Sequence, residues 1–452
     1  MDKKNLKICI VGGGPAGIAA AMYLEKKGYT DYVVLEKEDH IGGKCYSPTY
    51  MGKRYESGAI MGCDSYYAIH DMELFGGTTH DGPTLDRIYK RANGKKYDPF
   101  DPKRFWQIPH LLKLKKQMKR LAELLKTKYV GYDVNGHRGV SEGKYDGYSP
   151  ANVDRVHVSG VNPNLKDLIL PFDKFCEINN VPLVKEVFVG PYTSFGYGYF
   201  DEIPAAYVLK YLDMHTILEF VAIRLWTWKQ GTQSIFEGVN AKLKHQARLN
   251  CNISKVTRTK DKVSVTVNGK VEEYDKIIVT APLQFLPDYF DATKEEKDLF
   301  SKIDYERYDV LATTIKEGHY PDISCYLFDN MKLENMGRLM VFYHRWANEP
   351  NQIITTYSLR KHKDMKEIPF ETAKNNVIKD MATIDTPVDK VIREFKWYYF
   401  PHVFSEDYKN GWYEKVEAMQ GKKNTYYAGE VMSFGDMEET CEYSRELVER
   451  FF

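Results

Sequence analysis

The chain has 452 residues, of which 43% are hydrophobic and 28% are charged, and its formal net charge is +1. A chain of this length is too long for one small core, so we expect it to divide into two or three domains. The near-neutral charge provides no overall field that favours nucleic acid. No window approaches the roughly 18 consecutive apolar residues of a membrane-spanning helix. The 34 tyrosines and 22 phenylalanines can line an apolar cavity, although a large core accounts for most of them.

Seven cysteines occur singly along the sequence, with no CxxC pair and no Cys/His group at metal-ligand spacing. This pattern fits a reducing compartment, and it predicts that no metal is bound. The N-terminal residues 1–7 are polar and lead directly into a predicted strand, so no secretory signal is expected. We therefore expect a cytoplasmic protein.

Near the N-terminus the sequence predicts a strand, a glycine-rich turn, a helix and a second strand. The run 8–11 is apolar, as in a parallel strand buried on both faces, and an Ala-rich helix is expected at 18–27. The apolar run 32–35 then ends on Glu36, nineteen residues after Gly17. This order is typical of a dinucleotide-binding unit.

The residues of this turn each have a physical role in binding a dinucleotide. Gly12 permits the tight turn out of the strand, and Gly14 lets backbone N–H groups approach the pyrophosphate. Gly17 lets the helix pack against the sheet, so that its positive N-terminal end faces the phosphates. Glu36 can accept hydrogen bonds from ribose hydroxyls. The cofactor-binding residues expected here are Gly12, Gly14, Pro15, Ala16, Gly17, Glu36 and Lys37.

The segment after Glu36 favours FAD over NAD. Residues 40–44 resemble the Gly-Gly-Arg element of the FAD-binding glutathione-reductase and amine-oxidase families, with Lys44 in place of the usual arginine. Residues 54–58 stand where those families bring the chain beneath the flavin. No second GxGxxG occurs with its own strand and helix, which argues against a bound NAD(P)H. The cofactor-binding residues expected here are Gly43, Lys44, Gly58, Ala59 and Ile60.

Two distant segments are expected to complete the cofactor domain. A helical stripe at 233–243 precedes strands predicted at 252–259, 262–268 and 274–280. In the amine-oxidase pattern this hairpin approaches the adenine, the following strand returns to the phosphates, and a C-terminal Gly-Glu pair contacts the ribityl-pyrophosphate. A last helix from about Asp436 is expected to direct its N–H groups at the flavin. The residues that this pattern implies are Ile253, Val256, Ala281, Gly429, Glu430 and Met437.

We therefore expect an α/β fold in which a Rossmann-like FAD-binding domain is built from discontinuous segments, as in flavin amine oxidases. An α+β substrate domain and a helical cap complete it. The expected boundaries are residues 1–75, 225–285 and 418–452 for the FAD-binding domain, 76–100 and 286–417 for the substrate-binding domain, and 101–224 for the cap.

Long stretches of unusual composition extend over nearly the whole chain, at residues 54–62, 81–87, 195–213, 226–228, 343–346, 352–357, 397–402 and 408–421. In these stretches the sequence resembles the bacterial polyunsaturated fatty acid double-bond isomerases, which form conjugated linoleic acid. The resemblance implies redox-neutral chemistry with a free fatty acid as the partner. FAD N5 would take a hydride from the bis-allylic carbon of a cis,cis-diene and return it at another carbon, so no catalytic side chain is expected.

The same resemblance implies four substrate-binding residues. The isomerases hold the fatty acid carboxylate near the channel mouth with an arginine and a phenylalanine, and the matching residues are Arg87 and Phe220. Phe195 matches a residue that lines the channel near the diene, and Tyr192 precedes it in the same run. Aromatic walls suit this reaction because ring faces attract a developing positive charge.

Three other functions share parts of this pattern. A flavin amine oxidase has the same fold, but the C-terminal Ser-Gly-Gly-Cys-Tyr that attaches flavin in some of its members is absent, and Cys441 lies inside the last predicted helix. FAD is therefore expected to bind non-covalently. A carotenoid-type desaturase also abstracts hydride but passes electrons onward. An FAD-containing lipid-binding protein would bind fatty acid without turnover.

Two segments are not accounted for by the resemblance to the isomerases. Residues 111–128 have apolar side chains at helical spacing and seven basic residues on the other positions, which is typical of a solvated helix face or of a surface that contacts membrane. Residues 138–165 are rich in Gly, Ser, Asn and Asp and predict an exposed loop. The oligomeric state and the preferred fatty acid stay open.

Overall fold

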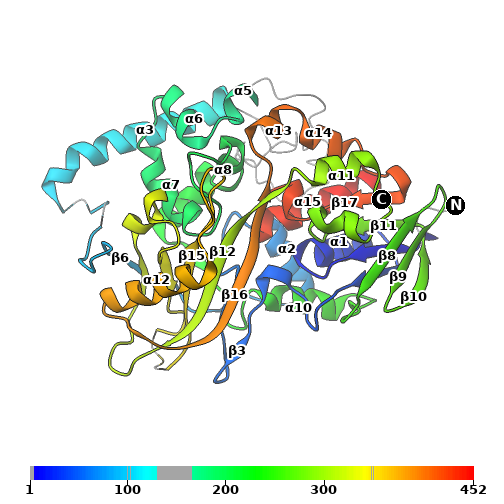
Figure 1. The fold of residues 1–452 in the computed structure, drawn as a ribbon, viewed down its shortest axis with the longest axis horizontal. Coiled ribbons are helices and arrows are strands. Elements are labelled where there is room, and N and C mark those ends of the chain that lie inside the picture. Colours follow the sequence, from blue (N-terminus) through cyan, green and yellow to red (C-terminus); the bar gives the residue numbers. More distant parts are fainter. Residues whose placement is uncertain (1–4, 99, 102, 130–164, 348, 350) are drawn as a thin grey trace.

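A computed structural model describes residues 5–98, 100–101, 103–129, 165–347, 349 and 351–452. The predicted exposed loop at 138–165 falls outside the described residues except for Leu165. Three layers of structure are seen in Figure 1: a parallel sheet with its helices beside both labelled chain ends, a second sheet containing two long strands, and a group of helices above it.

A four-stranded parallel sheet brings together segments that are far apart in the sequence. Its order is β17-β11-β1-β2. The strands are β1 (Ile8–Val11), β2 (Tyr32–Leu35), β11 (Lys276–Val279) and β17 (Thr425–Tyr427). Ile10 of β1 pairs with Val34 on one side and Ile278 on the other. Strand β1 is fully apolar and buried, which explains why it occupies the middle of the sheet.

Helix α1 (Pro15–Lys26) packs on this sheet, and α15 (Met437–Phe451), α10 (Gln233–Lys242) and α2 (Tyr67–Gly76) pack on α1 and on one another. Helix α1 begins at Pro15, three residues before the expected start, because proline at a first helical turn needs no hydrogen bond for its nitrogen. The predicted stripe of α10 is buried at Ile235 and Val239. The last helix starts as expected, with Asp436 as its N-cap.

Beside the parallel sheet lies an antiparallel sheet of β8 (Ile253–Arg258), β9 (Val263–Val267) and β10 (Lys270–Tyr274). The strand predicted at 274–280 is wrong at its start, because Tyr274 ends β10 and β11 begins at Lys276. The single strand predicted at 274–280 therefore spans the end of a hairpin and the start of a parallel strand.

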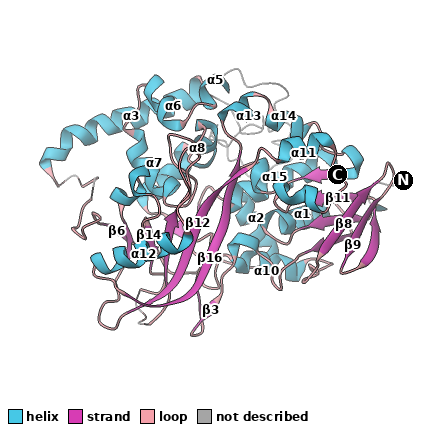
Figure 2. Cartoon of the chain, in the orientation of Figure 1, coloured by secondary structure: helices cyan, strands magenta, loops and turns pink. Residues whose placement is uncertain are grey.

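The larger sheet has six strands in the order β16-β12-β15-β14-β13-β6. They are β6 (Arg87–Tyr89), β12 (Asp304–Ile315), β13 (Ser324–Tyr326), β14 (Val341–Tyr343), β15 (Ile354–Leu359) and β16 (Val388–His402). The long strands β12 and β16 lie at the centre of Figure 2. Strand β6 pairs in parallel with β13 at the sheet's edge. Arg87 is therefore held by a sheet that is otherwise built from residues 304–402.

The remaining elements connect these layers. The upper helices are α3 (Ile108–Thr127), α5 (Leu165–Leu168), α6 (Phe172–Ile178), α7 (Val184–Thr193), α8 (Ala205–Tyr211) and α9 (Met214–Ala222). The others are β3 (Thr49–Tyr50), β4 (Lys53–Arg54), β5 (Gly62–Cys63), β7 (Leu225–Trp226), α11 (Lys294–Phe300), α12 (Phe370–Thr383), α13 (Ser405–Lys409) and α14 (Trp412–Glu417). Within the described ranges, the structure contains no helix with both the length and the apolarity that crossing a membrane requires.

Candidate cofactor and substrate site

A cavity of about 690 Å³ opens where the four parallel strands end. Val11 and Leu35, the last residues of β1 and β2, line it, as do Thr280 and Ala428, which follow β11 and β17. In open α/β sheets, ligands bind at the carboxyl ends of the strands. The volume lies within the range of small-molecule and cofactor sites, about 300–1,000 Å³.

Gly17 and Gly14 differ in what the absence of a side chain allows. A Cβ on Gly17 would lie 1.9 Å from the carbonyl oxygen of Gly12, so Gly17 is required for packing of α1 against the turn. A Cβ on Gly14 would meet only the Cα of Gly43, at 3.8 Å, which is an ordinary contact. The protein itself therefore has room for a side chain at Gly14, and what the glycine keeps free is the cavity that Gly14 lines.

Glu36 stands at the cavity wall and also closes the turn. Its Oε2 accepts a hydrogen bond from the Gly13 amide at 2.6 Å, and its Oε1 accepts one from the Glu38 amide at 2.8 Å. The carboxylate is thereby fixed beside the N-terminus of α1, with acceptor capacity left for hydroxyl groups of a ligand.

Lys44 connects an N-terminal segment of the chain to a C-terminal one at the site. Its Nζ lies 2.5 Å from the Oε2 of Glu430, and both side chains are partly buried. The ammonium group also lies 5.2 Å from the ring centre of Tyr399. A lysine at this position keeps one positive charge near the glycine-rich turn, with the acid of the C-terminal Gly-Glu pair as its partner.

A second, smaller hollow of about 70 Å³ adjoins the first, since Pro15, Lys44, Glu430 and Thr440 line both. Its walls are mainly aromatic and aliphatic. They include Gly58, Ala59, Ile60, Met61, Tyr66, Phe195, Tyr197, Tyr211, Tyr308, Tyr399 and Met437. The hollow thus continues the cofactor cavity into an apolar compartment.

The tyrosines of the hollow form one packed group of neutral phenols. The ring centres of Tyr308 and Tyr399 are 5.0 Å apart, and those of Tyr197 and Tyr399 are 5.6 Å apart. Burial raises the pKa of each of these hydroxyls, so none ionises near neutral pH. These tyrosines therefore contribute neutral ring faces to the wall of the hollow, beside the polar groups of Lys44, Glu430 and Asp436.

Asp436 lines the hollow at the start of α15. Its side chain accepts a hydrogen bond from the Glu439 amide at 2.7 Å, which caps the helix. Burial raises the pKa of its carboxyl group to about 7. Met437 and Thr440, in the first turn of α15, line the hollow as well, so the positive N-terminal end of this helix is directed at it, as expected from the sequence.

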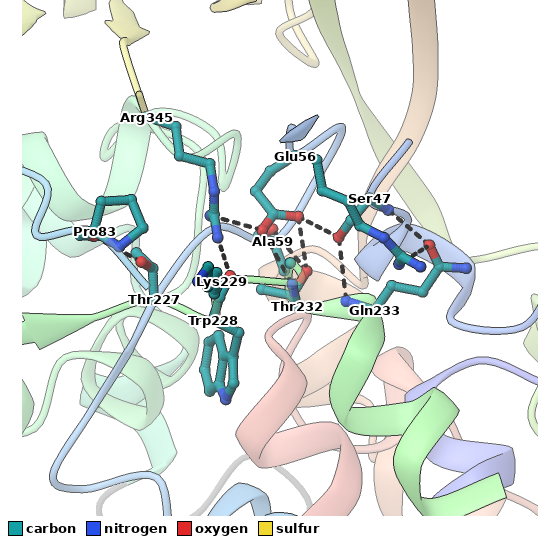
Figure 3. A network of polar contacts seen from close by, with 12 residues as sticks. Ser47, Glu56, Ala59, Pro83, Thr227, Trp228, Lys229, Thr232, Gln233 and Arg345 are labelled. Carbon is teal, nitrogen blue, oxygen red and sulfur yellow. Dashed lines mark hydrogen bonds and ion pairs between the residues drawn. The ribbon is translucent and has the colours of Figure 1, made fainter. Parts of the chain in front are cut away.

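A buried ion pair stabilises the segment 58–60, which lines the smaller hollow. The Nη1 of Arg345 lies 2.9 Å from the Oε1 of Glu56, and both side chains are almost fully buried. Glu56 also accepts hydrogen bonds from Ser47 Oγ and from the amide of Thr232, whose own hydroxyl donates to the Ala59 carbonyl at 3.1 Å. Figure 3 shows Arg345 and Glu56 directed at each other above Thr232.

The structure brings most of the expected cofactor residues to one site. Those that line the larger cavity are Gly12, Gly14, Pro15, Ala16, Glu36, Lys37, Gly43, Lys44, Ile253, Ala281, Gly429 and Glu430. Gly58, Ala59, Ile60 and Met437 line the smaller hollow. Val256 lies elsewhere: its side chain is buried in the core and its amide donates to the Tyr289 carbonyl. Gly17 lies behind the wall, as its packing role requires.

The four expected substrate-binding residues lie at different distances from the hollow. Phe195 lines the hollow, and the ring of Phe220 packs on it with ring centres 5.7 Å apart. Arg87 lies beyond Phe220 and donates to the Phe220 carbonyl and to the hydroxyl of Tyr89. Tyr192 is fully buried behind Tyr197, so it is part of the packing around the hollow and not of its wall.

Several residues of the site were not predicted individually. Tyr197, Tyr211, Tyr399, Glu56 and Arg345 lie inside the matching stretches, but no local spacing marks them. A composition rich in tyrosine was the one signal for the hollow. His70, Glu73 and His80 form a further cluster, and no metal-ligand spacing in the sequence marks it, because its ligand atoms come together only in the folded chain.

Comparisons with known proteins agree with this geometry. A family model described as an NAD(P)-binding Rossmann-like domain matches residues 10–72, and one described as flavin containing amine oxidoreductase matches residues 162–440. A structure of putrescine oxidase shares the fold, with 14% identity, 98% of each chain covered and a TM-score of 0.67. The chain therefore belongs to the flavin containing amine oxidoreductase family.

Two isomerases are similar to this chain. The crystal structure of the CLA-producing fatty acid isomerase from P. acnes matches it with 46% identity over 100% of both chains and a TM-score of 0.90. The polyenoic fatty acid isomerase of Ptilota filicina is 24% identical over 68% of this chain and 65% of its own length. An FAD-dependent oxidoreductase of Colletotrichum higginsianum is 23% identical over 95% of this chain and 89% of its own length.

The cofactor of this protein is FAD, and the residues present fit it. A phosphate group suits the N-terminus of α1, where Gly14 leaves the backbone uncovered. The fixed carboxylate of Glu36 suits ribose hydroxyls. The adjoining apolar hollow, with the positive end of α15 at its wall, suits a flat ring that gains electrons.

Proposed function

We propose that this protein is an FAD-dependent double-bond isomerase that converts a non-conjugated cis,cis polyunsaturated fatty acid, such as linoleic acid, to a conjugated one. The observation that carries the proposal is the 46% identity with the fatty acid isomerase over the full length of both chains. The aromatic walls of the hollow beside the cofactor cavity support it, because the diene of a fatty acid would reach the flavin ring there against apolar side chains such as Phe195.

Bound FAD supplies a hydride acceptor that also returns the hydride, so the reaction has no net oxidant. The chain's own residues have three tasks. Tyr197, Tyr308 and Tyr399 exclude water from the hollow, since their rings are buried and packed on one another. Their ring faces stabilise a positive charge that develops on the diene, by about 0.5–2 kcal/mol for each well-placed ring.

The third task is to hold the fatty acid by its carboxylate, and we assign it to Arg87. The partly buried guanidinium of Arg87 contacts Phe220, and the ring of Phe220 packs on Phe195 at the wall of the hollow. A carboxylate held by Arg87 would place the acyl chain past the two phenylalanine rings. Rearrangement of the Arg87–Phe220 contact would admit the substrate.

We predict that Arg87→Met weakens binding of the free fatty acid by about tenfold to a hundredfold, because a charge-assisted hydrogen bond is worth about 1.5–3 kcal/mol. Binding of the methyl ester should change little. The measurement is a titration of the holoenzyme's flavin spectrum with acid and with ester. Arg91→Met, which removes the arginine paired with Asp329 further along the same strand edge, is the matched control. Equal losses for acid and ester would refute the carboxylate role.

The proposed reaction is tested by anaerobic incubation of the holoenzyme with linoleate. We expect the ultraviolet absorbance of a conjugated diene to rise over many turnovers without oxygen or NAD(P)H. An amine oxidase or a desaturase would stop after one reduction of its flavin and leave no conjugated product. A lipid-binding protein would bind linoleate and leave the absorbance unchanged.

We also propose that α3 contacts the surface of anionic membranes, from which the substrate is drawn. Before and within the first turns of α3, Phe105, Trp106, Ile108 and Leu112 expose between 44% and 75% of their surface. By helical spacing Leu112 shares a face with the exposed Lys115, Lys116 and Lys119. Apolar side chains beside lysines are what an interfacial helix uses, while Leu114, Leu121 and Leu125 fasten α3 to the protein. Figure 1 shows α3 at the side opposite both labelled ends.

For this surface we predict that Lys115→Gln, Lys116→Gln and Lys119→Gln together weaken binding to phosphatidylserine vesicles at least tenfold, since each lysine near an anionic surface contributes about 1 kcal/mol. Flotation at low ionic strength measures the binding. A variant carrying Lys255→Gln, Lys260→Gln and Lys270→Gln, which are exposed on the hairpin sheet, is the control and should float like the parent. If the parent fails to float, α3 is only a solvated face of the protein.

A further inference from the structure

Two histidines and one glutamate converge outside the cofactor cavity. His70 and Glu73 lie one turn apart on α2, and His80 follows the left-handed turn at Gly77 that ends this helix. The Nδ1 atom of His70 is 3.0 Å from Oε2 of Glu73, and the Nδ1 atom of His80 is 3.2 Å from Oε1. The three ligand atoms all lie within 4.8 Å of one another.

We propose that His70, Glu73 and His80 form a binding site for a divalent transition metal ion, with zinc as the best-fitting ion. Zinc binds imidazole nitrogen and carboxylate oxygen at about 2.0–2.2 Å in a tetrahedron, whose edges are then about 3.3–3.6 Å. The observed Nδ1–oxygen distances are within a few tenths of an ångström of such an edge. A shift of a few tenths of an ångström, in which each Nδ1 atom moves slightly away from the carboxylate, therefore gives these edges their tetrahedral length.

The surroundings support a metal more than a plain hydrogen-bonded cluster. The carboxylate of Glu73 is buried and receives a hydrogen bond from Trp228 Nε1 at 2.5 Å, which fixes its orientation as outer partners of metal ligands do. The ring of His80 stacks on Trp226, with centres 4.3 Å apart, and this holds the imidazole in place. Both histidine side chains stay more than a third exposed, so an ion can enter and water can take the fourth position.

The ligand set selects among ions. Mg²⁺ and Ca²⁺ prefer cages of oxygen atoms, whereas two imidazoles and one carboxylate suit zinc and its neighbours. The ion would fasten α2 to the segment around Trp226 and Trp228. The carbonyl of Trp228 in turn accepts from Arg345, so the metal would brace the region that carries the Glu56–Arg345 pair. Its role is structural, and it is independent of the proposed isomerisation.

Calorimetric titration of the FAD-loaded protein with Zn²⁺, in a buffer that does not chelate metals, tests this site. We expect one equivalent to bind, the fluorescence of Trp226 to change, and the Tm to rise, while Mg²⁺ does none of these. His70→Gln and His80→Gln should each weaken zinc binding by more than about a hundredfold, because even the loss of an outer partner weakens it about 10- to 100-fold. The flavin spectrum should stay unchanged.

Two further variants make the result specific. Glu73→Gln keeps an oxygen for Trp228 but removes the negative charge, and we expect it to lose zinc while it stays folded. His245→Gln removes an exposed histidine elsewhere and should bind zinc like the parent. Equal zinc affinity in the parent, His70→Gln and His80→Gln would overturn the site, and so would a parent that binds no zinc.

Discussion

Replacing Gly14 with alanine is expected to leave the protein folded and to weaken its binding of FAD by about tenfold to a hundredfold. The Cβ would meet nothing closer than the Cα of Gly43, at 3.8 Å, and the backbone at Gly14 has a φ of −75°, which alanine adopts freely. The methyl group would occupy the space through which the pyrophosphate approaches the backbone. Forcing one extra carbon into a packed contact costs about 1–3 kcal/mol.

The measurement for Gly14→Ala is retention of FAD through dialysis, together with the Tm of the cofactor-free protein. Gly190→Ala is a matched control, because its Cβ would make only ordinary contacts, at 3.6 Å and 3.7 Å, with the ring of Phe328. We expect Gly190→Ala to retain FAD. If Gly14→Ala retained FAD equally well, the pyrophosphate would not lie at this turn.

The second large effect concerns the buried ion pair. Arg345→Met is expected to lower the free energy of unfolding by about 3–5 kcal/mol, because it leaves the carboxylate of Glu56 buried without its opposite charge. Burial already raises the pKa of Glu56, and Arg345 is the strongest influence that lowers it. FAD should also be lost more readily, since the amide of Thr232 donates to Glu56 and its hydroxyl donates to the carbonyl of Ala59 at the hollow.

Urea unfolding of the holoenzyme measures this loss. Lys53→Met is the control, because it breaks the nearby ion pair with Glu349, which is partly exposed, and should cost less than about 1 kcal/mol. Adding Glu56→Gln to Arg345→Met removes the unpaired buried charge of Glu56 and should recover part of the free energy of unfolding. A loss for Arg345→Met no larger than that for Lys53→Met would show that the pair does not support the site.

The cofactor half of the site could be predicted because its determinants are local. Gly12, Gly14 and Gly17 stand at fixed spacing on one turn, and Glu36 ends the next strand, so a short stretch of sequence defines their geometry. The later strands and Asp436 followed from apolar periodicity and from a resemblance to flavoenzymes. The FAD fold and the likeness to fatty acid isomerases were confirmed by the comparisons.

The parts that the sequence did not predict depend on which way side chains face and on contacts between distant segments. Val256 lies on a correctly predicted strand, but alternation alone does not tell which face borders the cavity, and its side chain enters the core. Tyr308 and Tyr399 meet because β12 and β16 pair, ninety-one residues apart. Glu56 and Arg345 are 289 residues apart, so no motif could pair them.

The measurement that tests the central claim most directly is an isotope-labelling experiment with deuterated linoleate. Linoleate carrying two deuterium atoms at its bis-allylic carbon is incubated with the holoenzyme without oxygen, and the product is analysed by mass spectrometry and NMR. Because the hydride is held in a water-excluded hollow and then returned, we predict a conjugated product that keeps both deuterium atoms, one of them on a different carbon. Loss of one deuterium from each product molecule, or a product that forms only with an external electron acceptor, would contradict the account.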